Sequence, residues 1–195
     1  MRTIYFIRHG QTGWNAEGRL QGAHDIDLNA VGEEQAASVA PRLAAVAGPA
    51  LAQAEFVASP LLRTRRTMEI MRANLGLPPG DYRIDPRLRE IGFGGWEGAT
   101  WAEVRRRDPA GAGQRDRMRW QHRPPGQGGE SYAMLKERVA PVFAELGPVT
   151  VVVAHGGVAR AMLVALEQLD TYAAPRLGIR QGEVLVVDGQ GWRWA

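Results

Sequence analysis

Short apolar runs alternate with amphipathic stretches along this chain, and several runs end abruptly at a polar residue followed by glycine. The runs at 4–7 and 55–58 are rich in β-branched and aromatic residues, which is typical of buried strands. The run at 149–154 is apolar at nearly every position and predicts a central strand covered on both faces. Weaker patterns predict a short strand at 82–85 and a closing hairpin formed by 183–187 and 192–194.

Helix signals fill the first intervals between these strands. Asn29 is a suitable N-cap for a helix that ends at Gly48, and Pro41 inside this helix predicts a kink or a break. Ser59 and Pro60 predict an N-cap and a first helical position, and the helix is expected to continue to about residue 74. Both helices would then cross over the sheet to the next strand.

The second half of the chain contains three further predicted helices. Thr100 and Glu103 form a capping-box pattern that opens a short helix to about residue 107. Residues 108–130 are rich in Gly, Arg, Gln and Pro and predict an irregular segment. The remaining helices are expected at 131–146 and from about 158 to 169.

The alternation of strands and helices predicts an α/β fold, a three-layer α/β/α sandwich with a mostly parallel central sheet. We expect one domain, residues 1–195, with a small lid-like insertion at about 92–130. A chain of 195 residues is long enough to bury a sizeable core. No apolar run reaches the ~20 residues of a membrane span and the N-terminus lacks a signal-peptide pattern, so we expect a cytoplasmic protein without a membrane partner.

Composition narrows the possible chemistry. The chain has no cysteine, which excludes disulfides, thiolate metal sites and cysteine nucleophiles together. The net charge is only +3, and Lys136 is the single lysine, so nearly all the positive charge is guanidinium. Arginine binds phosphate and carboxylate groups in a bidentate manner, which lysine cannot do. A base-composition bias toward Arg, Ala and Gly explains most of the arginines, however, so their total is not an argument for function.

Two of the predicted strands end in the same way. The first leads into Arg8-His9-Gly10 and the strand at 149–154 leads into His155-Gly156-Gly157. Because parallel strands open their carboxyl ends onto one edge of a sheet, His9 and His155 are expected to face one another there. Arg63 follows a third strand end and falls in the first turn of a predicted helix, whose N-terminus favours anions.

Four motifs together resemble those of the histidine phosphatase superfamily, which includes the phosphoglycerate mutases. The first is Arg8-His9-Gly10-Gln11-Thr12 followed by Trp14-Asn15, and the second is Ser59 with Arg63 and Thr67 at intervals of four. The third is Glu90 ahead of the glycine-rich loop at 92–98, and the last is His155-Gly156-Gly157. The resemblance spans residues 3 to about 167.

This resemblance implies a metal-independent enzyme without a cofactor that acts on a small phosphorylated substrate. His9 would be the nucleophile that forms a phosphohistidine, Glu90 the proton donor, and His155 the third catalytic residue. The groups implied to bind phosphate are Arg8, Arg63, Asn15, Thr12, Gln21, Gly22 and Gly156.

The superfamily contains both phosphatases and mutases, and two features favour a phosphatase. Gln11-Thr12 follows the first glycine where mutases typically have Glu-Ser, and Gln21-Gly22-Ala23 departs from a mutase pattern of a small hydroxyl residue and then Gly-Trp. The chain is also short for the enclosing structure that a mutase needs. A cofactor-dependent phosphoglycerate mutase is therefore the alternative.

Other readings fit the sequence less well. The arginines at 105–107 and 115–123 could follow a nucleic-acid backbone, but the modest net charge and interspersed acidic residues argue against a nucleic-acid partner. We expect these arginines to lie on a solvated helix face and lid, with one or two of them meeting a second anionic group of the substrate. His24 near Asp25 and Asp27 is a weak pointer to a metal, because the four histidines lack paired ligand spacing. A non-catalytic phosphate-binding member is disfavoured by the intact motifs, and a homodimer is left open.

Overall fold

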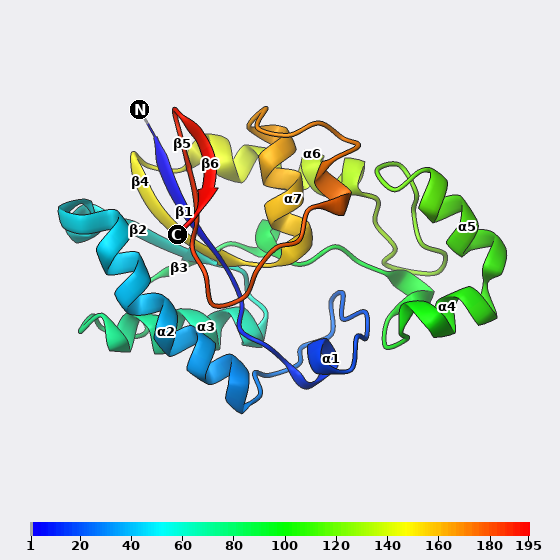
Figure 1. Cartoon of the computed structure of the whole chain (residues 1–195), viewed down its shortest axis with the longest axis horizontal. Coiled ribbons are helices and arrows are strands. Elements are labelled where there is room, and N and C mark those ends of the chain that lie inside the picture. The colour runs from blue at the N-terminus through cyan, green and yellow to red at the C-terminus, as the bar shows by residue number, and fades with distance from the viewer. Residues whose placement is uncertain (1) are drawn as a thin grey trace.

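The computed structural model describes residues 2–195. Six strands form one sheet in this part of the chain, in the order β3-β2-β4-β1-β5-β6 (Figure 1). They are β1 (Thr3–Arg8), β2 (Glu55–Ala58), β3 (Arg83–Ile84), β4 (Val149–Ala154), β5 (Leu185–Asp188) and β6 (Gly191–Trp194). β3, β2, β4 and β1 run parallel, whereas β5 is antiparallel to β1 and to β6. The predicted central strand and closing hairpin are thus confirmed.

Helices cover both faces of this sheet. Helices α2 (Ala30–Ala47) and α3 (Leu62–Asn74) cover one face, and α6 (Tyr132–Glu145) and α7 (Gly156–Ala165) cover the other. The remaining α-helices of the described chain are α1 (Gly13–Ala16), α4 (Trp101–Arg107) and α5 (Pro109–Arg117). Alternation along β1 divides the core, because Phe6 packs in a cluster with residues of α6 and α7, whereas Tyr5 packs in a second cluster with residues of α2 and α3. The predicted three-layer α/β/α sandwich is confirmed (Figure 1).

Several predicted helix boundaries are wrong. Helix α3 begins at Leu62, and its N-cap residue is Leu61 rather than Ser59. The Ser59 hydroxyl contacts His155 Nε2 at 2.7 Å and accepts only a long hydrogen bond from Leu61 N at 3.4 Å, while Leu62 N donates to the Asp25 carboxylate. Helix α7 begins at Gly156 and ends at Ala165, earlier at both ends than predicted. Helix α2 ends at Ala47 with Gly48 as its C-cap, as predicted, and continues through Pro41 as one element, so the alternative of a break at Pro41 is wrong.

The segment 108–130, predicted as irregular, contains a helix. Asp108 caps α5 by accepting a hydrogen bond from Gly111 N at 2.8 Å, and Pro109 occupies the first position. With α4 this helix forms an outlying unit that Figure 1 shows beside the sheet layers, in green. A small apolar cluster holds the unit together, consisting of Leu20, Trp96, Ala99, Val104 and Ala112.

No helix within residues 2–195 is both long enough and apolar enough to cross a bilayer.

Candidate active site

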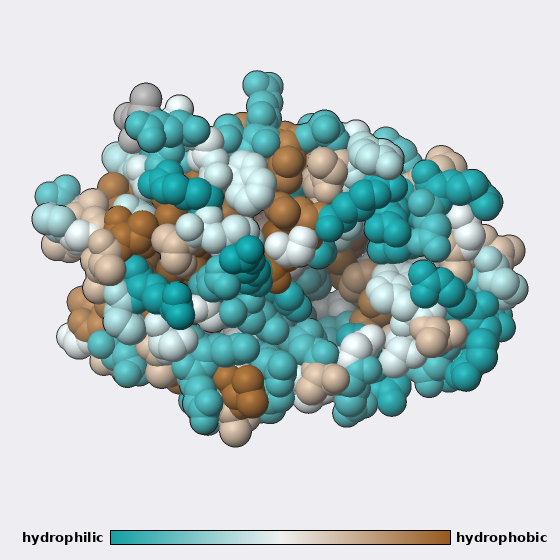
Figure 2. All heavy atoms as spheres, viewed as in Figure 1, coloured by the Kyte–Doolittle hydropathy of each residue, from teal (hydrophilic) through white to brown (hydrophobic). Residues whose placement is uncertain are grey.

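A cavity of about 250 Å³ lies between the carboxyl edge of the parallel strands and the outlying unit. The space-filling view is hollowed at this place, and hydrophilic side chains border the hollow (Figure 2). Residues from β1, the loop after α1, α3, α6 and α7 line it, together with residues from the segment 90–124. The cavity therefore collects groups that are far apart in sequence.

His9 lies at the floor of this cavity, directly after β1, with 2% of its surface exposed. Its Nδ1 lies 2.8 Å from the carbonyl oxygen of Gly10. Because a carbonyl only accepts, Nδ1 must carry the ring proton, and the lone pair of the neutral imidazole is on Nε2. Nε2 accepts a hydrogen bond from Arg63 Nε at 3.3 Å. The tautomer that a nucleophilic imidazole needs is thus selected by the backbone.

Gly10 is required at this position by a close backbone approach. Its N–H donates to Thr67 Oγ1 at 3.0 Å, and a Cβ here would collide with the backbone of Gly32 in the first turn of α2. The glycine therefore allows the end of β1 to pack against α2 and α3, which holds the His9 ring in place.

His155 lies beside His9, with 5.2 Å between ring centroids and an edge-on orientation. It is fully buried at the end of β4. The Ser59 hydroxyl holds its Nε2 at 2.7 Å, whereas its buried Nδ1 has no hydrogen-bond partner in the described chain. The predicted meeting of the two imidazoles is observed, and Ser59, predicted as a helix cap, orients one of them.

Both imidazoles are held neutral by their surroundings. Burial lowers the pKa of His9 well below its ordinary value of 6.5, and the positive charges of Arg63 and Arg8 lower it further. Burial likewise lowers the pKa of His155, with Arg63 the next cause. A neutral His9 keeps the lone pair that nucleophilic attack requires.

Two guanidiniums flank the imidazoles. Arg63 is fully buried and donates to the carbonyl oxygens of His24 at 2.7 Å and Gly22 at 3.0 Å. Burial lowers its pKa to about 10, which still leaves it charged at neutral pH. Arg8 donates through Nη1 to the Ile179 carbonyl at 2.8 Å, while its buried Nε has no partner in the described residues.

Two buried polar atoms near His9 have no hydrogen-bond partner in the described chain. Arg8 Nε belongs to the residue before His9, and His155 Nδ1 belongs to the ring that packs edge-on against His9. Buried polar atoms without partners are rare because each one costs free energy. An oxyanion in the cavity would accept hydrogen bonds from donors of this kind. The site therefore suits a compact anion that lies next to His9 Nε2.

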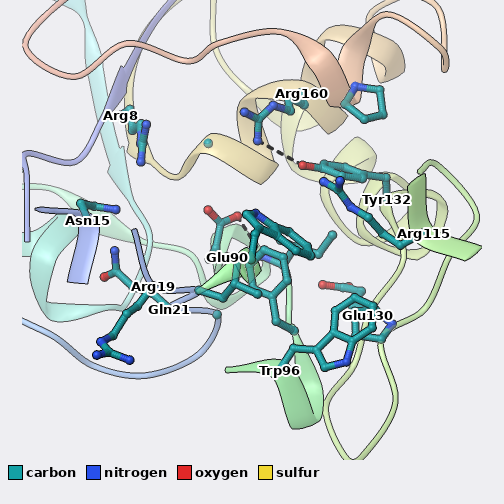
Figure 3. Close-up of a pocket in the computed structure, with 18 of the residues that line it drawn as sticks. Arg8, Asn15, Arg19, Gln21, Glu90, Trp96, Arg115, Glu130, Tyr132 and Arg160 are labelled. Carbon is teal, nitrogen blue, oxygen red and sulfur yellow. Dashed lines mark hydrogen bonds between the residues drawn. The ribbon is translucent and has the colours of Figure 1, made fainter. Parts of the chain in front are cut away.

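Glu90 is positioned by the N-terminus of α7. Its Oε1 accepts hydrogen bonds from Gly157 N at 3.0 Å and Ile91 N at 2.9 Å. A Cβ on Gly157 would collide with this carboxylate, so glycine is needed there. Arg138 fixes the same segment by donating to the carbonyl of Arg89 at 2.9 Å. Figure 3 shows the Glu90 carboxylate in the middle of the pocket.

Of the two predicted phosphate-binding residues in the segment that follows β1, Asn15 lines the cavity and Thr12 does not. Asn15 lines the cavity, and its Oδ1 is occupied by Thr12 N and Gln181 Nε2, both at 3.2 Å, which leaves its amide donor available. Thr12 is not among the lining residues, because its hydroxyl caps α1 by accepting from Asn15 N at 3.1 Å. The structure therefore places Thr12 behind Asn15 rather than in the cavity.

The other predicted phosphate-binding residues do line the cavity. Gln21 reaches it with a buried Oε1 that has no partner in the described chain. Gly22 has a positive φ of 51° and turns its carbonyl toward Arg63, and Gly156 forms the first turn of α7. These three positions line the cavity with His9, Asn15, Arg8 and Arg63, whereas His155 lies behind His9 and is not a lining residue.

The cavity wall also contains Arg19, Arg115, Tyr132 and Arg160 (Figure 3). Arg115 belongs to the arginines of which one or two were expected to meet the substrate, whereas the other three residues were not predicted. Of these three, Arg160 carried a usable signal, since it stands four residues after Gly156 and so falls on the same face of α7. Within residues 2–195 no cluster of three or more His, Asp or Glu side chains is arranged to hold a metal ion.

Burial of the two imidazoles predicts that acid destabilises the fold. The unfolded chain protonates them near the ordinary pKa of 6.5, whereas the folded protein keeps them neutral to lower pH. Above pH 6.5 both rings are neutral in the folded and the unfolded chain, so they do not make the free energy of unfolding depend on pH. Below pH 6.5 that free energy falls with the pH, by up to about 1.4 kcal/mol per pH unit for each ring. Urea unfolding between pH 7.5 and 5.5 measures the slope. His9→Asn should reduce it, and an unchanged slope would contradict this assignment.

Three comparisons place the chain among known proteins. A family model described as "Histidine phosphatase superfamily (branch 1)" matches residues 4–195. A relative from Escherichia fergusonii named "Probable phosphoglycerate mutase GpmB" is 34% identical, and the match covers 100% of this chain and 88% of the relative.

Two solved structures have similar folds. The structure of the mycobacterial glucosyl-3-phosphoglycerate phosphatase in complex with VO3 has a TM-score of 0.80 and 31% identity, covering 100% of this chain and 96% of that one. The structure of an alpha-ribazole-5'-P phosphatase, so described, from Escherichia coli K-12 has a TM-score of 0.79 and covers 100% of this chain and 94% of that one. At 23% identity the second structure supports the fold alone.

Proposed function

Because this chain belongs to the histidine phosphatase superfamily, we propose that it hydrolyses a small phosphomonoester through a phosphohistidine formed on His9. The observation that carries the proposal is the hydrogen bond from His9 Nδ1 to the Gly10 carbonyl at 2.8 Å. It leaves the Nε2 lone pair directed at a cavity whose donors suit an oxyanion. The relative named as a glucosyl-3-phosphoglycerate phosphatase supports hydrolysis as the outcome.

In the first step His9 Nε2 attacks phosphorus in line with the departing oxygen, forming the N–P bond as the P–O bond breaks. Negative charge on the phosphoryl oxygens is stabilised by Arg8, Arg63 and the Nδ1–H of His155. Arg63 Nε, now 3.3 Å from His9 Nε2, shifts its hydrogen bond to a phosphoryl oxygen. The charge on the guanidiniums is permanent at neutral pH, so no proton transfer is needed to form this clamp.

Glu90 acts as the general acid in the first step and as the general base in the second. As the ester bond breaks, its protonated carboxyl donates a proton to the leaving alkoxide, which departs as an alcohol. The resulting carboxylate then takes a proton from water as that water attacks the phosphohistidine and releases inorganic phosphate. The two backbone N–H groups that hold Glu90 keep its carboxyl in one orientation through this exchange.

A phosphoglycerate mutase is the second candidate, favoured by the 34% identity to the protein named GpmB. A mutase would need the same nucleophile and clamp but would return the phosphoryl group to a second substrate hydroxyl before water could attack. The Gln11-Thr12 and Gln21-Gly22-Ala23 patterns favour the phosphatase.

A hydrolysis screen separates the two candidates. The purified protein is incubated with a panel of phosphorylated metabolites, and inorganic phosphate is measured. A parallel reaction contains 3-phosphoglycerate with catalytic bisphosphoglycerate, and formation of 2-phosphoglycerate is followed. We expect phosphate release from at least one monoester and no isomerisation. Isomerisation that outpaces phosphate release would overturn the proposal in favour of the mutase.

A further inference from the structure

Of the arginines that line the cavity, one is neither used by the proposed mechanism nor paired with an acidic residue of the described chain. Five arginines line the cavity: Arg8, Arg19, Arg63, Arg115 and Arg160. Arg8 and Arg63 face the phosphoryl position, whereas Arg19 is paired with Glu17 at 2.6 Å and Arg115 with Asp116 at 3.0 Å. Arg160 forms no ion pair with any Asp or Glu of residues 2–195. It therefore has no acidic partner of its own in the described chain, and it has no part in the chemistry.

Arg160 is held in a defined position. Its Nε donates to the carbonyl of Leu177 at 2.9 Å, and its Nη1 donates to the Tyr132 hydroxyl at 3.1 Å (Figure 3). The Tyr132 ring is itself stacked on Trp120, with 5.7 Å between centroids and 13° between planes. Both partners of the guanidinium are neutral, so they orient the group without neutralising it.

This guanidinium lines the cavity beside Arg8. Arg160 follows Gly156 by one helical turn of α7, and a Cβ on Gly156 would lie 3.7 Å from both Arg160 Nη1 and Arg8 Nε. Two cations thus flank one backbone position. Burial lowers the pKa of Arg8, the negative charge of Glu90 opposes this, and the positive charge of Arg160 adds a smaller lowering effect. A bound oxyanion between the two guanidiniums would stabilise both.

The nearby carboxylates do not supply these oxygens. Glu130 lines the same wall, but Arg138 pairs with it at 2.6 Å. The Glu90 carboxylate is bound by the N–H groups of Gly157 and Ile91 and serves proton transfer. A single phosphoryl group is already met by Arg8 and Arg63. Arg160, which has no ion-pair partner among residues 2–195, is therefore available to a second anionic group of the substrate.

We propose that Arg160, oriented by Tyr132, binds a second oxyanion, a carboxylate or a further phosphate, carried on the alcohol half of the substrate. The inference rests on the proposed function and adds a substrate class to it, namely doubly anionic phosphomonoesters. It makes Arg160 a specificity-determining residue for the leaving group rather than a ligand of the transferring phosphoryl.

Matched substrates test this assignment. Phenyl phosphate is compared with its para- and meta-carboxy derivatives and with the corresponding phenylene bisphosphates. We expect wild-type kcat/KM to be higher for at least one doubly anionic ester than for phenyl phosphate. Arg160→Gln should reduce that preference about tenfold or more, the scale of one hydrogen bond between charged groups. Tyr132→Phe should reduce it less. The series with the higher kcat/KM, carboxyphenyl phosphates or phenylene bisphosphates, identifies whether the second group is a carboxylate or a phosphate.

Arg42→Gln is the control for net charge, because this exposed arginine lies on α2, on the other face of the sheet, and should keep the wild-type preference. Equal losses on all esters in Arg160→Gln would make Arg160 a phosphoryl ligand and overturn the inference. The absence of any wild-type preference for a second anion would overturn it as well.

A binding measurement separates this inference from the proposed function. Calorimetry with phenylphosphonate and carboxyphenylphosphonate requires no turnover. If no ester is hydrolysed but the carboxylated phosphonate binds more tightly and loses that advantage in Arg160→Gln, the hydrolase proposal fails and the subsite stands. If esters are hydrolysed but the two phosphonates bind equally, the subsite fails alone.

Discussion

His9→Ala is expected to lower kcat for phosphomonoester hydrolysis by at least about a thousandfold, because water would have to replace the covalent route through phosphohistidine. The imidazole is buried, neutral, and oriented by its bond to the Gly10 carbonyl. None of the other groups around the cavity offers an unprotonated nitrogen in the same place. The measurement is steady-state hydrolysis of para-nitrophenyl phosphate, combined with rapid acid-free quenching to detect phosphohistidine.

His24→Ala is the matched control, since the His24 side chain is half exposed and pairs with Glu97 rather than facing the cavity floor. It should retain activity within about tenfold of the wild type, the range of an indirect effect on positioning. Wild-type protein should carry a base-stable phosphoryl label that His9→Ala lacks. Labelling of the alanine variant, or turnover near the wild-type rate, would assign the nucleophile elsewhere.

Glu90→Gln is expected to slow hydrolysis of alkyl phosphates by about 10²–10⁴-fold, the usual contribution of a general acid or base. The glutamine has nearly the same shape and can accept from Gly157 N, but it cannot supply a proton. Para-nitrophenyl phosphate has a leaving group that departs without protonation, so its release should slow far less. A burst of para-nitrophenol would then report the remaining slow step, attack of water on phosphohistidine.

Glu137→Gln provides the comparison, because this carboxylate on α6 is 78% exposed and pairs only with Lys136. Its kinetic constants should match those of the wild type on both substrates. If Glu90→Gln slowed the initial release of para-nitrophenol as much as that of an alkyl alcohol, Glu90 would not be the proton donor.

Most of the strands and the principal site motifs could be predicted from local sequence. The run at 149–154 predicted a central strand covered on both faces, because every position along it is apolar or β-branched. The structure agrees, since β4 pairs with β1 on one side and with β2 on the other. The Arg8-His9-Gly10 and His155-Gly156 endings followed, since parallel strands deliver their carboxyl ends to one edge. Asn29 and Thr100 were identifiable as caps because a cap is a local hydrogen bond.

The errors arose where a side chain has a distant partner. Ser59 has the composition of a helix cap, yet its hydroxyl is taken by His155, 96 residues away, and α3 starts later. Thr12 was predicted to bind phosphate, but its hydroxyl caps α1. The helix within 108–130 was hidden because Pro and Gly have poor helix propensity, although Asp108 and Pro109 are favourable at its start.

The sequence by itself determined which apolar runs form buried strands, where those strands end and which family this chain joins, because these depend on short-range pattern and on motifs. Only the tertiary structure decided the tautomer of His9, the partnerless donors around it and the neutral partners that orient Arg160. Those properties arise from contacts between segments separated by tens of residues, where burial and neighbouring charges set the protonation state and no local pattern records them.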